Sequence, residues 1–255
     1  MVPARVNDLG PLSLLLDTGY GMTMLSAAHA KTLELPRRGS ITIVGIAGES
    51  PADVFEGPSF DFSGTTWKPR RVAALPPDGR SRRRDGILGS GFFRRYVVEI
   101  NPWEKHLRLH EPSTFEYAGP GEILPLTFKG STPIVAAKVR VGDQSLVETQ
   151  LEIDTGCDSA LCIGRHFADA HSLLATNSAG AGNRVGVGGG TRTKVGHLPA
   201  LKLGNLTVEK PSANFFLEGS PADPPLAGHI GLELLRSYKV TFDYARKRMI
   251  LETKR

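Results

Sequence analysis

The chain has 255 residues, of which 40% are hydrophobic and 22% charged, with 29 glycines and 18 prolines. This length can bury a core without disulfide staples, and the composition excludes collagen-like and disordered chains. The net charge of +5 is too small to define a class by itself. No apolar stretch approaches the ~18 residues that span a bilayer, and residues 1–5 lack the apolar centre of a secretory signal. We expect a globular chain rich in turns, with no membrane partner within this segment.

The first elements in chain order form a hairpin that leads into an acidic turn. Short apolar runs at 2–6 and 12–16 flank a turn, which predicts two antiparallel strands. The second strand runs directly into Asp17-Thr18-Gly19. A short helix is expected at 26–33, with Ser26 as its N-cap.

An arginine-rich segment, Arg80–Arg84, follows later in the first half. Pro and Gly residues bracket it, which predicts a solvated loop. It lacks the interleaved aromatic residues of a nucleic-acid surface, so we expect no nucleic-acid partner. The alternative is a docking surface for an acidic partner, and high salt should abolish that docking.

The second half shows the same elements in the same order. A strand at 123–128 precedes a hairpin of strands at 135–141 and 146–153, which runs into Asp154-Thr155-Gly156, and a helix is expected at about 164–174. The strand at 123–128 has no counterpart before Val2. We therefore expect residues upstream of Met1, and the compartment stays open, with the periplasm or secretion both compatible.

The two halves are copies of one unit. Residues 14–19 recur as 151–156, and Gly86-Ile87-Leu88-Gly89 recurs as Gly228-His229-Ile230-Gly231. From there the copies align without a gap, 89–109 against 231–251. The repeat predicts an all-β chain with two similar lobes, at 1–112 and 122–255, joined by a linker at 113–121.

Two Asp-Thr-Gly motifs, each at the end of an apolar strand, resemble the aspartic peptidases, in particular the retropepsin-like group of the bacterial type with both lobes on one chain. The resemblance implies a bilobal pepsin-like or retropepsin-like fold of two pseudo-symmetric β-barrel lobes, each with a short helix. It implies an aspartic endopeptidase, a hydrolase that acts on an extended polypeptide. Asp17 and Asp154 are then the catalytic pair, because two adjacent carboxyls share a proton and supply both an acid and a base. This chemistry requires no metal and no cofactor.

Family resemblance also supplies the supporting roles. Thr18 and Thr155 are expected to bond across to the opposite lobe, while Gly19 and Gly156 donate hydrogen bonds to the carboxylates. The segments 86–89 and 228–231 are expected to hold each turn from below. Two glycine-rich hairpin tips are flap candidates for substrate binding: Gly45, Ile46, Ala47 and Gly48 in the first lobe, and Gly186, Val187, Gly188 and Gly189 in the second. A second half-site in the same chain predicts a monomer.

The residues after the two triplets depart from the family pattern. Tyr20 and Cys157 stand where Ala or Ser is common. Neither offers a short aliphatic hydroxyl to lower a carboxylate pKa, so we expect activity at mildly acidic to neutral pH. The bulk of Tyr20 motivates the alternative of a catalytically inactive module that binds peptides or proteins.

The cysteines and histidines give no metal signal in the sequence. Cys157 and Cys162 are five residues apart, an offset that points side chains to opposite faces of a strand, so a pairing is not expected. Cys157 is interpreted as a packing residue, with a redox-sensitive thiol as the alternative. The seven histidines have no ligand spacing on one element, and we expect no metal site.

Overall fold

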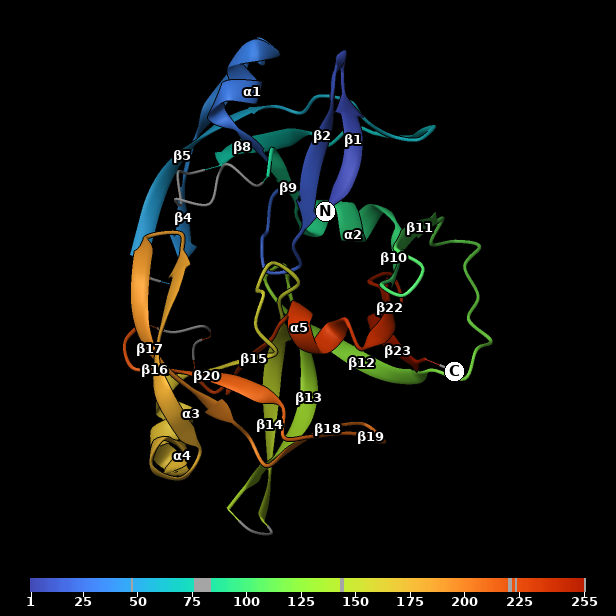
Figure 1. Cartoon of the computed structure of the whole chain (residues 1–255). Coiled ribbons are helices and arrows are strands. Elements are labelled where there is room, and N and C mark those ends of the chain that lie inside the picture. Colours follow the sequence, from blue (N-terminus) through green and yellow to red (C-terminus); the bar gives the residue numbers. More distant parts are fainter. Residues whose placement is uncertain (47, 76–83, 143–144, 220–221, 223, 255) are drawn as a thin grey trace.

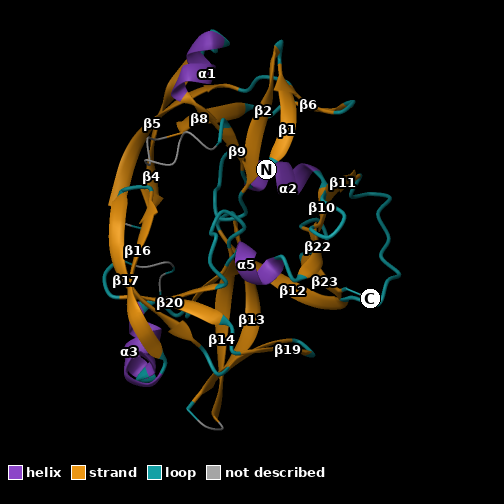
Figure 2. Ribbon diagram, viewed as in Figure 1, coloured by secondary structure: helices purple, strands orange, loops and turns teal. Residues whose placement is uncertain are grey.

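A computed structural model describes residues 1–46, 48–75, 84–142, 145–219, 222 and 224–254. The two halves of the sequence form two lobes, the first coloured blue to teal and the second yellow to red in Figure 1. Strands make up most of both lobes, and the helices are short (Figure 2). The all-β, two-lobed architecture expected from the repeat is therefore confirmed.

The first lobe is built on one sheet, with strand order β4-β5-β8-β3-β9-β2-β1-β6-β7. Its strands are β1 (Val2–Val6), β2 (Leu9–Leu16), β3 (Met24–Ser26), β4 (Arg37–Gly45), β5 (Gly48–Glu56), β6 (Phe60–Phe62), β7 (Thr65–Trp67), β8 (Arg71–Leu75) and β9 (Gly86–Leu88). Its helices are α1 (Ala27–Thr32) and α2 (Ser90–Arg95). The Ser26 side chain accepts a hydrogen bond from the backbone N–H of His29 at 3.2 Å, so the predicted N-cap is confirmed.

The second sheet has the order β11-β10-β22-β23-β12-β13-β14-β21-β15-β20-β17-β16, with β18 added on β13 and β19 on β18. Its strands are β10 (Val97–Asn101), β11 (His106–His110), β12 (Glu122–Lys129), β13 (Thr132–Val141), β14 (Ser145–Ile153), β15 (Leu161–Ile163), β16 (Ser178–Gly186), β17 (Gly189–His197), β18 (Ala200–Leu203), β19 (Leu206–Glu209), β20 (Ser212–Phe216), β21 (Gly228–Ile230), β22 (Tyr238–Asp243) and β23 (Arg248–Thr253). Three short helices accompany it: α3 (Arg165–Ala170), α4 (Leu173–Thr176) and α5 (Leu232–Leu235). The single helix predicted at 164–174 is wrong, because Ser172 adopts a left-handed φ of 53° and divides it into α3 and α4.

Strands from both copies of the repeat share the second sheet. β10 pairs antiparallel with β22, its equivalent in the other copy, with Val98 opposite Phe242 and Ile100 opposite Val240. Equivalent strands that pair in this way define a pseudo-twofold axis near Glu99. Phe93 of α2 packs edge-on against Phe242 with ring centroids 5.4 Å apart, which adds apolar burial to the junction. The exact division at 1–112, 113–121 and 122–255 stays a prediction.

Within the described residues, no helix has the length and apolar character needed to span a membrane.

Candidate active site

Each Asp-Thr-Gly turn lies at the end of a strand that a glycine-ended segment supports. β9 pairs parallel with β2, and the backbone N–H of Asp17 continues this pairing with a 3.1 Å hydrogen bond to the Leu88 carbonyl. β21 pairs parallel with β14 in the same way, and the N–H of Asp154 donates to the Ile230 carbonyl at 2.9 Å. The segments at 86–89 and 228–231 thus hold the two turns in equivalent positions.

The two threonines join the turns across the pseudo-twofold axis. The Thr18 hydroxyl donates to the carbonyl of Ile153 at 2.6 Å and accepts from the N–H of Thr155 at 3.0 Å. The Thr155 hydroxyl donates to the carbonyl of Leu16 at 2.9 Å and accepts from the N–H of Thr18 at 3.1 Å. Because both hydroxyls are buried with both partners satisfied, the network fixes the relative position of the lobes.

The structure brings Asp17 and Asp154 together at the centre of this network. A Cβ added at Gly19 would lie 2.9 Å from Oδ1 of Asp154 and 3.3 Å from Oδ1 of Asp17, so the two carboxyls lie side by side. The N–H of Gly19 donates to Oδ1 of Asp17 at 3.0 Å, and the N–H of Gly156 donates to Oδ1 of Asp154 at 2.9 Å. A Cβ at Gly156 would lie 2.0 Å from Oδ2 of Asp17, so only glycine allows the opposite carboxylate to approach.

Burial shifts the proton affinity of both carboxyls. Burial, together with the charge of Asp154, holds the pKa of Asp17 well above its usual range. Burial also raises the pKa of Asp154, although the charge of His229 opposes the shift. The pair therefore keeps a proton at pH values where an isolated aspartate has lost it.

Two hairpin tips enclose a cleft of about 730 Å³ above the carboxyls. Residues of the β4–β5 tip and the β16–β17 tip line it together with Asp17 and Asp154. The tips touch, because a Cβ at Gly45 would lie 2.3 Å from the carbonyl oxygen of Val187. Of the flap candidates, Gly45, Ile46, Gly186 and Val187 line the cleft, Gly48 lies next to Gly188, Gly189 lies outside the cleft lining, and Ala47 is outside the described residues.

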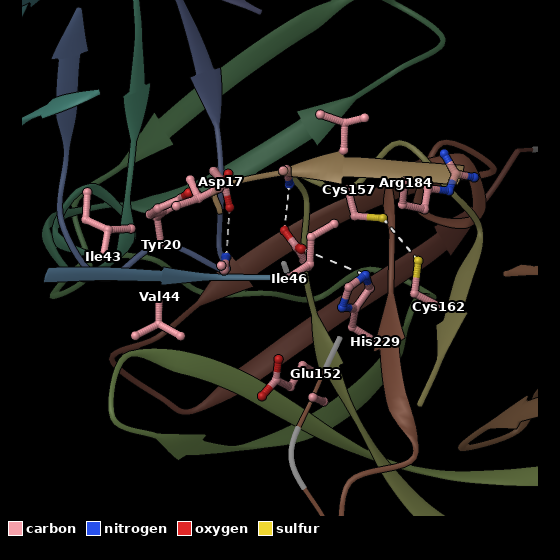
Figure 3. Close-up of a pocket in the computed structure, with 18 of the residues that line it drawn as sticks. Asp17, Tyr20, Ile43, Val44, Ile46, Glu152, Cys157, Cys162, Arg184 and His229 are labelled. Carbon is pink, nitrogen blue, oxygen red and sulfur yellow. Dashed lines mark hydrogen bonds and ion pairs between the residues drawn. The ribbon is translucent and has the colours of Figure 1, made fainter. Parts of the chain in front are cut away.

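Tyr20 fits beside its turn without displacing it. Its carbonyl accepts a 2.8 Å hydrogen bond from the N–H of Ser90. Its side chain, half-buried, packs on the apolar cluster beneath the first hairpin, which includes Met24, Ile43 and Ile87. Figure 3 shows Tyr20 and Ile43 on the Asp17 side of the pocket. The packing of the turn therefore gives no reason for inactivity.

Figure 3 shows a second cluster, made of Cys157, Cys162 and His229, across the pocket from Tyr20 and Ile43, which no sequence motif indicated. The sulfurs of Cys157 and Cys162 lie 3.6 Å apart, and Nε2 of His229 lies 4.0 Å from Oδ2 of Asp154. The expectation that the cysteines point apart is wrong, because Cys157 lies in the turn and Cys162 on β15, so they do not share a strand. The position of His229 inside the glycine segment beneath the turn was the available signal.

This cluster also shifts proton affinities. A hydrogen bond from Cys162, aided by His229 and opposed by burial, lowers the pKa of Cys157 to about 3. Burial lowers the pKa of His229, but the hydrogen bond and charge of Cys157 outweigh it and raise that pKa to about 9. Both shifts favour the charged forms of the Cys157 thiol and the His229 ring.

The arginine-rich segment is described only at its end. Residues 80–83 lie outside the described residues, so the docking alternative stays a prediction. Arg84 lines the cleft, and its charge opposes the rise in the pKa of Asp17.

Comparisons with known proteins agree with this geometry. Residues 2–92 match the protein family described as "Aspartyl protease". The structure is similar to a crystal structure of the aspartic proteinase from Irpex lacteus, with a TM-score of 0.66 and 18% sequence identity over 99% of this chain and 93% of that one. Among curated proteins, none matches the sequence. The chain therefore has the pepsin-like fold over both lobes, and its first lobe matches the aspartyl protease family over residues 2–92.

Proposed function

We propose that this chain is an aspartic endopeptidase that hydrolyses extended polypeptides. The observation that carries the proposal is that the Asp17 and Asp154 carboxyls lie side by side at the floor of a cleft. Burial of two adjacent carboxyls lowers the stability of the fold, which favours a functional role for the pair. Glycine N–H groups bind the two carboxylates, and the threonine hydroxyls hold the two turns together.

The mechanism follows from one shared proton. Asp17 has the more strongly raised pKa and holds the proton, while Asp154 acts as the base. Asp154 removes a proton from a water molecule as the water oxygen attacks the peptide carbonyl carbon, and Asp17 donates its proton to the developing oxyanion, which gives a neutral gem-diol. The C–N bond then breaks as the leaving nitrogen takes the proton from Asp154 and a diol hydroxyl returns a proton to Asp17, which restores the starting state of the pair.

The hairpin tips favour an extended substrate. Both tips cross the cleft and present strand backbone toward it, so they can hydrogen-bond a peptide in β conformation. Alternate side chains would then enter pockets on either lobe. Because both carboxyls come from one chain, the active unit is a monomer.

The test is cleavage of casein or a peptide library by the purified chain, followed by mass spectrometry, with and without a statine-type inhibitor. Asp17→Asn and Asp154→Asn should each reduce kcat by about 10²- to 10⁴-fold, the range of acid–base catalysis. Asp169→Asn, an exposed carboxylate on α3 paired with Arg165, serves as the matched control and should cleave normally.

Cleavage that persists in both variants overturns the proposal. Saturable peptide binding by the unmutated chain without any cleavage supports the alternative, an inactive peptide-binding or protein-binding module.

A further inference from the structure

The topology of the second lobe brings three ligand-type side chains to one place. β15 and β21 pair antiparallel, and Cys162 lies directly opposite His229. Side chains directly opposite each other share one face of a sheet, with Cβ atoms about 4.5–5.5 Å apart. Cys157 is anchored nearby, since its carbonyl accepts a 2.7 Å hydrogen bond from the N–H of Leu232.

The spacing of the three ligand atoms suits a shared ion. The two sulfurs and a ring nitrogen of His229 all lie within 4.8 Å of one another, and the sulfurs are 3.6 Å apart. Two thiolates that bind one tetrahedral zinc at ~2.3 Å lie about 3.8 Å apart. A disulfide requires about 2.05 Å, so the sulfurs have the separation of two ligands and not of a covalent pair.

The three residues are reachable from the cleft, and the charged side chains near them do not oppose a bound cation. Cys162 and His229 are buried, at 1% and 3% exposure, yet all three residues line the cleft. Glu152 lies beside His229 in the register of β14 and β21. The nearby cation, Arg184, forms a 3.1 Å ion pair with Asp158, so its charge is matched.

We propose that Cys157, Cys162 and His229 form a binding site for one divalent cation of the zinc class, with Asp154 next to the fourth coordination position. Two sulfurs and one imidazole select a thiophilic ion over magnesium or calcium. This proposal replaces the expectation of no metal site, which considered only ligands on a single element.

The site would control catalysis through Asp154. Zinc bound by three protein ligands keeps a fourth position for water or another ligand. The Asp154 carboxylate, 4.0 Å from Nε2 of His229, can fill that position after a small shift. An ion that binds Asp154 removes the base from the dyad, so bound zinc should stop hydrolysis. This consequence rests on the proposed function, whereas the binding itself does not.

The binding test uses the full chain, reduced and freed of metal by a chelator. After equilibrium dialysis against zinc, elemental analysis should find one equivalent of zinc per chain. Cobalt(II) in place of zinc should give thiolate-to-metal charge-transfer absorption in the near ultraviolet and tetrahedral d–d bands. Absence of bound metal, or a cobalt spectrum without thiolate charge transfer, overturns the proposal without recourse to any variant.

Variants locate the site. Cys162→Ser and His229→Gln should each weaken binding more than about 100-fold, since changes to outer-shell partners alone cost about 10–100-fold. His197→Gln, an exposed histidine on β17 of the same lobe, is the matched control and should bind as the unmutated chain does. Equal binding by all four proteins places the ion elsewhere and overturns the assignment.

Measurements of peptide hydrolysis with and without zinc distinguish the metal site from the proposed peptidase function. Zinc should abolish peptide hydrolysis by the unmutated chain, a chelator should restore it, and Cys162→Ser should lose this sensitivity. Hydrolysis that continues with the site filled overturns the role of Asp154 as a ligand. Stoichiometric zinc binding by a chain that cleaves nothing when metal-free overturns the proposed function and supports the metal site.

Discussion

The regions behind the two Asp-Thr-Gly turns are equivalent in backbone and opposite in chemistry. Met24 lies opposite Ile87 in the first lobe, as Cys162 lies opposite His229 in the second. Tyr20 follows the first triplet as Cys157 follows the second. The same three positions therefore carry apolar and aromatic side chains in one lobe, and two thiols and an imidazole in the other.

The contrast extends to the neighbouring strands. Leu15 pairs with Ile87 where Glu152 pairs with His229, and Ala73 stands beside Met24 where Asn214 stands beside Cys162. The first-lobe residues all belong to one hydrophobic cluster: Leu15, Tyr20, Met24, Ala73 and Ile87. Duplication has thus kept the turns alike while the layer beneath them diverged, which gives a symmetric dyad in an asymmetric cleft.

The largest effect is expected in the threonine network, which is the same in both turns. Thr18→Val removes a hydroxyl and leaves two buried backbone groups unsatisfied, at about 1–3 kcal/mol each, so the free energy of unfolding should fall by about 2–6 kcal/mol. Thr155→Val should cost as much, because its hydrogen bonds mirror those of Thr18. Urea unfolding measures both.

The matched controls are Thr18→Ser and Thr155→Ser, which keep the hydroxyl and lose one methyl group, at about 0.8 kcal/mol. The double valine variant should cost less than the sum of the two, since the residues share one network. A valine variant no worse than its serine control would show that the network does not hold the lobes together.

The two Asp-Thr-Gly turns and their glycine segments were predictable from the sequence. The cluster of Cys157, Cys162 and His229 was not. Asp17, Thr18 and their counterparts recur in a short motif, and the glycine segments recur with them, so the repeat alone pairs them. Cys157, Cys162 and His229 come from a turn and two three-residue strands whose register no local pattern gives. The break at Ser172 was missed for a related reason, because its left-handed φ leaves no mark in the helical periodicity.

A smaller effect is expected where the two hairpins meet. Gly45→Ala places a Cβ 2.3 Å from the Val187 carbonyl oxygen, so the tips must separate. We expect kcat/KM for a peptide substrate to fall roughly ten- to a hundredfold through a higher KM, because the substrate is held less closely. Gly180→Ala on β16, where an added Cβ meets nothing within 4 Å, is the control. Equal kinetics for both variants would mean that tip contact does not matter for substrate binding.

The last prediction concerns the influence of His229 on the pair of carboxyls. The pKa of Asp17 is higher in the folded chain than in the unfolded chain, where it is ~3.9, so the folded chain binds more protons and loses stability as the pH rises through this interval. Asp17→Asn removes that loss and should stabilise the protein at neutral pH by about 1.4 kcal/mol for each unit of pKa shift, with the gain vanishing below pH ~3.9. Asp154→Asn should gain less, because the His229 charge already offsets part of the burial of Asp154. Thermal unfolding across pH tests both variants, and gains of equal size would show that His229 does not act on the dyad.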